Sequence, residues 1–242
     1  MKKRTRIILS VCLAVLLLFG IGGYAYVSDY YNADEMAMAA MAYQTDSVQT
    51  RQDGDVIWFV PEDPTVGLIF YPGGKVEYTA YAPLMRACAE QGILCALVQM
   101  PGNLAVLDTD AADGLQQEHP EVTTWYIAGH SLGGAMAAGY AAAHEKDFNG
   151  LILLAAYSTK DLTATPLRAL SIYGSEDGVM NRESYEKNRS NLPADIIEVV
   201  LDGGCHAQFG SYGAQDGDGV PTISGEEQIR QTVEAIATFV GQ

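Results

Sequence analysis

From residue 56 onward, short apolar segments alternate with longer amphipathic segments. The apolar segments are rich in β-branched and aromatic residues, which is typical of strands covered on both faces. The expected strands are residues 56–60, 66–71, 93–99, 124–128, 151–155, 170–173 and 196–201. The expected helices are residues 78–91, 104–118, 132–145, 182–191 and 225–240. This alternation predicts an α/β fold with a mostly parallel sheet and helices on both faces.

The first thirty residues follow a different pattern. Residues 7–27 carry no charge, and at ~1.5 Å per residue such a helix spans a ~30 Å hydrocarbon core. Basic residues precede the stretch and acidic residues follow it: Lys2, Lys3, Arg4 and Arg6, then Asp29, Asp34 and Glu35. By the positive-inside rule, we expect a cytoplasmic N-terminus and an extracytoplasmic remainder. The alternative is a cleaved signal peptide, which would give a secreted protein.

The chain is expected to have three parts. Residues 1–27 form a cytoplasmic basic tip and a membrane anchor, and residues 28–54 form a stalk or docking segment. Within that segment, residues 34–41 carry a helical stripe of Met and Ala. Residues 55–242 suffice for one hydrophobic core and contain no internal repeats, so we expect one domain.

Composition narrows the classes of partner. The chain has 14 Lys and Arg against 30 Asp and Glu, a formal charge of −16, which repels phosphate backbones and excludes nucleic acid as an expected partner. No spacing of Cys, His, Asp or Glu is typical of a metal site, and we expect neither metal nor cofactor. Cys88 and Cys95 are the only closely spaced cysteines, and whether they form a disulfide stays open.

The strongest local motif is Gly129-His130-Ser131-Leu132-Gly133-Gly134. It follows an expected strand and begins an expected helix, and glycines two residues before and after Ser131 allow a sharp turn. Such a turn exposes the serine hydroxyl, which predicts that Ser131 is a nucleophile. The free N–H of Leu132, at the helix N-terminus, would stabilise a developing oxyanion.

Three segments together carry a family resemblance. They are Phe70-Tyr71-Pro72-Gly73-Gly74, the Ser131 motif, and Gly204-Cys205-His206-Ala207-Gln208-Phe209-Gly210. With them, the chain from residue 56 to the C-terminus resembles the α/β-hydrolase superfamily, and more specifically the small bacterial dienelactone-hydrolase-like group without a cap domain. The resemblance implies the α/β-hydrolase fold, with the nucleophile after the fifth strand. It implies no particular substrate.

A serine nucleophile needs a base and a carboxylate, which follow it in this fold in the order acid, then histidine. His119, His130 and His144 precede any acid that could serve, so His206 is the expected base. Asp177 lies just after an expected strand and is the expected acid. The adjacent Glu176 would face away from a site that Asp177 faces, and Asp202 stays as a possible substitute.

The second oxyanion donor is expected in the loop after residues 66–71. By likeness to the family this donor is the Gly74 N–H, with Lys75 as the alternative, and Tyr71 stands where many relatives have a histidine. Only about 14 residues separate the strands that end at Ala155 and begin near Leu170, which leaves no room for a helical cap. We therefore expect an open cleft.

These observations predict a membrane-anchored, extracytoplasmic serine hydrolase that cleaves an ester-like bond. Ser131 would carry the acyl group, His206 would act as base and then acid, and Asp177 would orient the imidazole. The substrate would be a small-molecule or surface-presented ester. Two alternatives stay open: an acyltransferase or thioesterase with the same triad, and a non-catalytic surface binding protein on a hydrolase fold.

Overall fold

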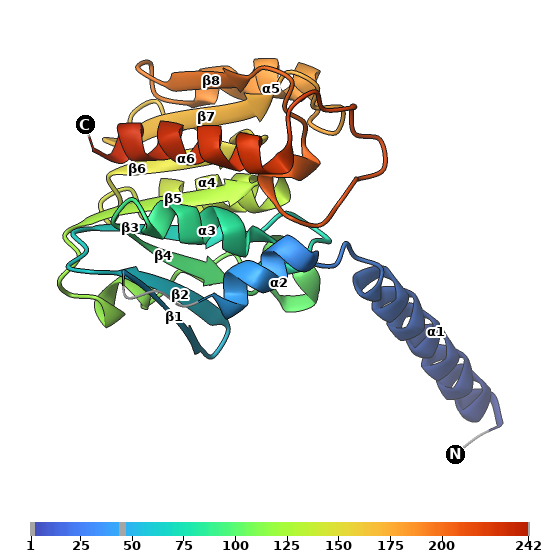
Figure 1. Ribbon diagram of the computed structural model, residues 1–242. Helices are drawn as coiled ribbons and strands as arrows, with labels where there is room; N and C mark the ends of the chain where they lie inside the picture. Colours follow the sequence, from blue (N-terminus) through green and yellow to red (C-terminus); the bar gives the residue numbers. More distant parts are fainter. Residues whose placement is uncertain (1–2, 44–46, 242) are drawn as a thin grey trace. The chain divides into compact units, whose positions relative to one another are not determined.

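The computed structural model describes residues 3–43 and 47–241. The chain divides into two compact units, residues 1–30 and residues 31–242. The first unit is one helix, α1 (Lys3–Ser28) (Figure 1). The second unit contains every strand of the described chain and the residues of the candidate site.

Helix α1 spans the stretch where the sequence predicts a membrane anchor. Among the helices of the described residues, however, none is both long enough and apolar enough to cross a bilayer, so the predicted transmembrane helix is not supported. Of the predicted basic cluster, Lys2 lies outside the described residues, as do the side chains of Lys3, Arg4 and Arg6.

One mixed sheet of eight strands forms the centre of the second unit. Its strands are β1 (Val48–Asp53), β2 (Val56–Pro61), β3 (Val66–Tyr71), β4 (Ile93–Val98), β5 (Thr124–His130), β6 (Gly150–Leu154), β7 (Arg168–Gly174) and β8 (Ile197–Leu201). Their order across the sheet is β1-β2-β4-β3-β5-β6-β7-β8. Strands β3 to β8 run parallel, and β1 and β2 pair antiparallel at one edge. The predicted mostly parallel sheet is confirmed.

Helices cover both faces of this sheet (Figure 1). The helices are α2 (Glu35–Ala42), α3 (Ala82–Ala89), α4 (Leu132–Ala143), α5 (Arg182–Asn188) and α6 (Gly225–Val240). On one face, α2 packs beside α3, and α3 beside α6, which buries Ile236 and Phe239. On the other face, α4 packs through Ala137, Ala138 and Ala141. Because these alanines are small, α4 packs closely on β5 and β6. This packing holds the N-terminus of α4 at the end of β5.

Short 3₁₀ turns make up the rest of the helical structure in the described chain. They are Tyr78–Tyr81, Pro101–Asn103, Ala105–Leu107, Leu115–Glu118, Arg189–Asn191 and Ala207–Phe209. The helix predicted at residues 104–118 is therefore wrong, because only two of these turns occur there. The Tyr71 hydroxyl donates to the Thr109 carbonyl and accepts from the Ala112 N–H, which holds this backbone in a loop. No helix lies between β6 and β7, a stretch that the structure describes throughout.

The segment of residues 28–54 contributes a strand that the sequence analysis does not predict. Strand β1 reads Val-Gln-Thr-Arg-Gln-Asp, and it is polar because it lies at the sheet edge, so no apolar pattern marks it. Helix α2 lies in this segment and packs beside α3. The buried Arg86 of α3 donates to the carbonyls of Ala40 and Tyr43 and to the Thr50 hydroxyl. The Arg86 guanidinium thus links α2, the residue after it and β1 to helix α3.

Residues 31–34 lie between two loops of the domain. The Tyr31 N–H donates to the Lys75 carbonyl (2.8 Å), and the Tyr31 hydroxyl accepts from the Asp216 N–H (3.1 Å). The Asp34 N–H donates to the Ser211 carbonyl (2.9 Å). Residues expected to form a stalk or docking segment therefore contact the loop after β3 and the loop before α6.

Cys88, Cys95 and Cys205 are buried free thiols, and Cys12 is an exposed free thiol. The possible Cys88–Cys95 disulfide is thus absent from the described structure, where both side chains fill the core between α3 and β4.

Two glycines of α4 provide a stability test of the packing. A methyl group at Gly133 would overlap the carbonyl oxygens of Tyr71 and Pro72, whereas one at Gly139 would meet open space. We expect Gly133→Ala to destabilise the fold by about 2 kcal/mol or more, because backbone must move. Gly139→Ala is the matched control and should stabilise it by about 0.5–1 kcal/mol. Urea unfolding measures both, and equal effects would contradict the described packing.

Candidate active site

Ser131 lies between the end of β5 and the start of α4, at the centre of the sheet. Its backbone has φ 51° and ψ −121°, a conformation that L residues rarely adopt. The Ser131 N–H donates to the Leu154 carbonyl at the end of β6 (2.9 Å). The turn is thus a strained elbow tied to the neighbouring strand, as the motif predicts.

The glycines of the motif allow this elbow to close. A Cβ at Gly129 would lie 2.6 Å from the backbone of Gly133 and Gly134, so the strand end and the first turn of α4 touch directly. At Gly133, a Cβ would overlap the loop after β3. The small residues therefore seat the N-terminus of α4 on the Tyr71–Pro72 backbone, next to the loop expected to provide an oxyanion donor.

His206 and Asp177 come together at the carboxyl ends of neighbouring strands. Asp177 follows β7, His206 follows β8, and the His206 Nδ1 lies 2.9 Å from the Asp177 Oδ2. The Asp177 Oδ1 accepts the N–H groups of Val179 (2.9 Å) and Met180 (2.8 Å), which fixes the carboxylate. Exposed fractions of 1% for the His206 side chain and 0% for that of Asp177 show that little water competes for this bond.

The other acids and histidines considered from the sequence have different surroundings. Glu176 and Asp202 are exposed, and the Glu176 carboxylate accepts from the Ser175 hydroxyl. His119 pairs with Glu121 (2.8 Å) and lies against Trp58, and the His144 ring lies 3.0 Å from the Tyr140 carbonyl. Of the predicted acids, Asp177 is therefore the one that holds the His206 ring.

His130, which chain order excludes as the base, takes part in a buried network beside Ser131. Its Nδ1 lies 2.7 Å from the Tyr81 hydroxyl, which also accepts the Gly73 N–H (3.1 Å). The His130 and His206 rings pack with centroids 4.4 Å apart. Burial and the neighbouring His206 lower the pKa of His130 well below its usual value, so its ring is neutral at pH 7.

This network links three parts of the site. The Tyr81 hydroxyl connects His130, the residue before Ser131, to Gly73 in the loop after β3. The His130 ring also packs against one face of the His206 ring. Burial raises the pKa of Tyr81 above its ordinary value, so the phenol keeps its proton. No sequence signal marks Tyr81 for this role, because it lies 49 positions from His130.

Backbone hydrogen bonds distinguish the candidate oxyanion donors. The Gly73 N–H is taken by Tyr81, and the Lys75 N–H donates to the Asn103 carbonyl (2.8 Å). Among the described residues, the Gly74 N–H has no acceptor, and the Leu132 N–H begins α4, where no carbonyl precedes it in the helix. A Cβ at Gly74 would lie 2.8 Å from the Leu132 side chain, so the two are neighbours. Of the two candidates in the loop after β3, Gly74 has the N–H without an acceptor in the described chain, while the Lys75 N–H is already bonded; the donor role of Leu132 and Gly74 stays a prediction.

The Ser131 hydroxyl makes no hydrogen bond to His206 in the described part of the chain. Catalytic hydrogen bonds are often long in unliganded sites and shorten when substrate binds. The His206 ring nonetheless packs on His130, the residue directly before the serine.

No group of three or more potential metal ligands comes together anywhere in the described chain. The polar groups around Ser131 are instead a hydroxyl, an imidazole–carboxylate pair and backbone N–H groups. Such a set can activate a hydroxyl and stabilise an oxyanion.

Solved structures share this fold at low sequence identity. Esterase Rv0045c of Mycobacterium tuberculosis matches with a TM-score of 0.60 and 12% identity, over 86% of this chain and 96% of that one. TT1662 of Thermus thermophilus matches with a TM-score of 0.59 and 16% identity, over 81% and 99%. Est1E of Butyrivibrio proteoclasticus matches with a TM-score of 0.56 and 14% identity, over 80% and 97%.

At the level of sequence, no curated protein matches the chain. A sequence profile matches residues 67–230, which include the Ser131 elbow, Asp177 and His206. The profile does not distinguish the dienelactone-hydrolase-like group, which stays a prediction. With its eight-stranded sheet and its elbow after β5, the chain belongs to the alpha/beta hydrolase family.

Proposed function

We propose that this hydrolase cleaves ester-like bonds through an acyl-enzyme on Ser131. The observation that carries the proposal is the buried 2.9 Å contact between His206 and Asp177, with the imidazole packed on the residue before the strained serine. A serine on such an elbow, followed by an oriented imidazole, is the arrangement that serine hydrolases use. The esterase among the structures of the same fold supports an ester as the substrate class.

The proposed reaction has two halves. The Ser131 Oγ attacks the ester carbonyl while the His206 Nε2 takes its proton, and the Asp177 carboxylate stabilises the imidazolium. The N–H groups of Leu132 and Gly74 stabilise the oxyanion. As the C–O bond breaks, His206 returns the proton to the leaving alcohol. Water then attacks the acyl-enzyme with His206 again as base, which releases the acid and restores the serine.

The surroundings of the site favour an accessible substrate. No helix covers the strand ends between β6 and β7 in the described chain. Leu104 lies beside Gly74, and in the turn that follows it Val106 and Leu107 are 54% and 59% exposed, so this turn offers apolar surface. These features support a small-molecule or surface-presented ester, held at an open cleft rather than enclosed.

Labelling with a fluorophosphonate probe tests the proposal. We expect the full chain to take up one phosphonyl group on Ser131, because the probe reports an activated serine rather than a free hydroxyl. Intact mass and peptide mapping locate the adduct, and Ser131→Ala serves as the control. An unlabelled wild-type chain, or a label on another serine, would contradict the assignment.

The location of the domain remains a separate proposal. It rests on the sequence alone, where four basic residues precede an uncharged stretch and acidic residues follow it. On this basis we place the hydrolase domain outside the cytoplasm. Neither the chemistry at Ser131 nor the fold depends on this placement.

A further inference from the structure

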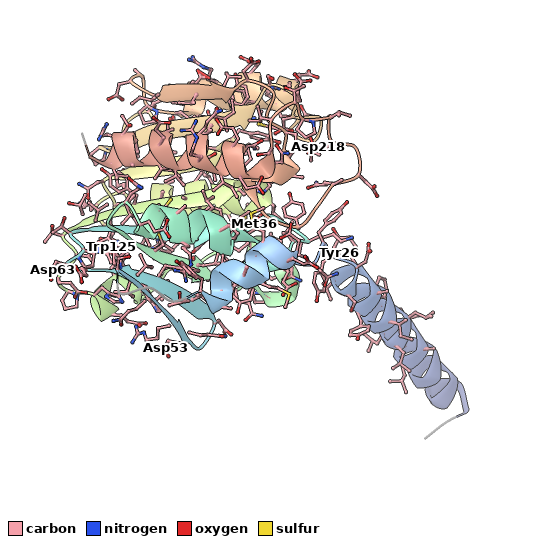
Figure 2. The ribbon with its side chains drawn as sticks, in the orientation of Figure 1. Tyr26, Met36, Asp53, Asp63, Trp125 and Asp218 are labelled. Atoms are coloured by element: carbon pink, nitrogen blue, oxygen red, sulfur yellow. The ribbon has the colours of Figure 1, made fainter. Side chains whose placement is uncertain are left out.

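Asp218 is a carboxylate that the sequence analysis does not assign and that the proposed mechanism does not use. It lies on the loop before α6 (Figure 2). Its Oδ1 accepts the N–H groups of Gly178 (3.1 Å), His206 (3.2 Å) and Gly219 (2.9 Å). Its Oδ2 accepts the Ala207 N–H (2.8 Å). One side chain therefore binds the residue after Asp177 as well as the backbone of His206.

Close backbone packing accompanies these bonds. A Cβ at Gly178 would lie 2.6 Å from the Gly217 carbonyl and 2.8 Å from the Gly219 nitrogen. A Cβ at Gly219 would overlap the Glu176 carbonyl. The loop of residues 217–219 is thus pressed onto the loop that carries Asp177, and glycine is required on both sides. The Asp218 carboxylate lies where three loops meet: the loop of residues 217–219, the loop after β7 that carries Asp177 (the Asp177 loop), and the loop after β8 that carries His206 (the His206 loop).

A carboxylate suits the position of Asp218, because four backbone N–H groups point at it. It presents two oxygens that only accept, so it can satisfy N–H donors arriving from several directions. Burial by itself raises the pKa of Asp218, but hydrogen bonds from the backbone and from the Cys205 thiol outweigh it and hold the pKa below its ordinary value. An asparagine of the same size would turn an NH₂ group toward at least one N–H donor.

From these contacts we propose that Asp218 is a positioning residue, which locks the Asp177 loop to the His206 loop and so keeps the imidazole against its carboxylate. Asp218 reaches no reacting atom and acts through the backbone alone. The proposal rests on the proposed function in that His206 and Asp177 are taken as the catalytic base and its partner. It accounts for the Asp-Gly-Asp-Gly sequence at residues 216–219, which resembles a cation loop but binds backbone N–H groups instead.

The test compares Asp218→Asn with Asp216→Asn in the full chain. Asp216 is exposed and lies two residues away on the same loop, so this control removes a nearby charge without removing the four bonds. The first readout is the ¹H NMR resonance of the His206 Nδ1–H, which lies downfield while this proton is hydrogen-bonded to Asp177 and is assigned with His206→Gln. The groups that face this ring are Asp177 and the neutral His130, and Asp218 meets its backbone.

Loosening the Asp177 contact lengthens this hydrogen bond, so the resonance should move upfield or disappear in Asp218→Asn and change little in Asp216→Asn. The second readout is ester turnover. We expect kcat to fall about 10- to 100-fold with KM within about 2-fold, since misplacement by a fraction of an ångström affects the reacting geometry more than binding. A purely structural role would lower the melting temperature and leave both readouts of the folded protein unchanged.

An unchanged Nδ1–H resonance in folded Asp218→Asn would overturn the proposal. If Asp218→Asn does not fold, Asp218→Glu takes its place, because it keeps the charge but moves the carboxylate by one methylene. It should move the resonance in the same direction, and an unchanged resonance would again refute the assignment. This NMR measurement needs no substrate, so it separates this proposal from the proposed function, whose failure would appear as a wild-type chain without Ser131-dependent turnover.

Discussion

Ser131→Ala is expected to lower kcat for ester hydrolysis by about 10⁴- to 10⁶-fold, the range found when a hydrolase loses its nucleophile. The fold should tolerate the change, because the elbow is held by backbone contacts of Gly129, Gly133 and Leu154 rather than by the hydroxyl. KM for a short p-nitrophenyl ester should change little. Steady-state release of p-nitrophenolate measures the effect, with circular dichroism as the check on folding.

Ser190→Ala is the matched control for this change. Ser190 lies in the turn Arg189–Asn191, is exposed, and has no role in the site, so its removal should leave kcat within about 2-fold of wild type. Residual activity from oxyanion stabilisation and binding should persist in Ser131→Ala at a low level. Equal turnover by wild type and Ser131→Ala would refute the acyl-enzyme mechanism.

Asp177→Asn should produce the second largest loss, about 10³- to 10⁴-fold in kcat. The substitution keeps the size of the side chain, but an amide stabilises no imidazolium and can hold the ring in the wrong tautomer. Because the Asp177 side chain has no exposed surface, water does not replace the lost charge.

Two neighbouring acids test whether the effect belongs to this carboxylate. Glu176→Gln alters the residue directly before Asp177, and Asp202→Asn alters the acid nearest to His206 in sequence. Both side chains are exposed, and neither contacts the His206 ring in the described structure, so each variant should stay within about 3-fold of wild type. A loss of 10³-fold or more in Asp202→Asn, with Asp177→Asn nearly unaffected, would reassign the acid.

Much of the fold and the site could be predicted because the signals are local. Buried strands of a parallel sheet are continuous apolar runs, and β3 and α6 have the predicted bounds. The elbow is marked by a serine between glycines at a strand–helix junction. Chain order then leaves one histidine, and the parallel strands β7 and β8 end side by side, so Asp177 and His206 meet.

The features that could not be predicted depend on distant contacts or on position in the sheet. Strand β1 is polar because only one neighbour pairs with it at the edge. Residues 104–118 have the apolar content of a helix, but the Tyr71 hydroxyl binds their backbone in a loop. Tyr81 and Asp218 act across long sequence separations, and Asp218 binds backbone groups, which leave no trace in side-chain patterns.

Residues 31–34 bind the loop that carries Gly74 through Lys75, and the loop that carries Asp218 through Ser211 and Asp216. A chain trimmed to begin at residue 55 would keep seven of the eight strands and lose the brace between these two loops. We expect the proposed oxyanion donor and the imidazole to be held less firmly relative to each other in such a chain. The first residues of the folded unit would then support the proposed reaction at a distance, and a chain that lacks them should turn over an ester more slowly than the full chain.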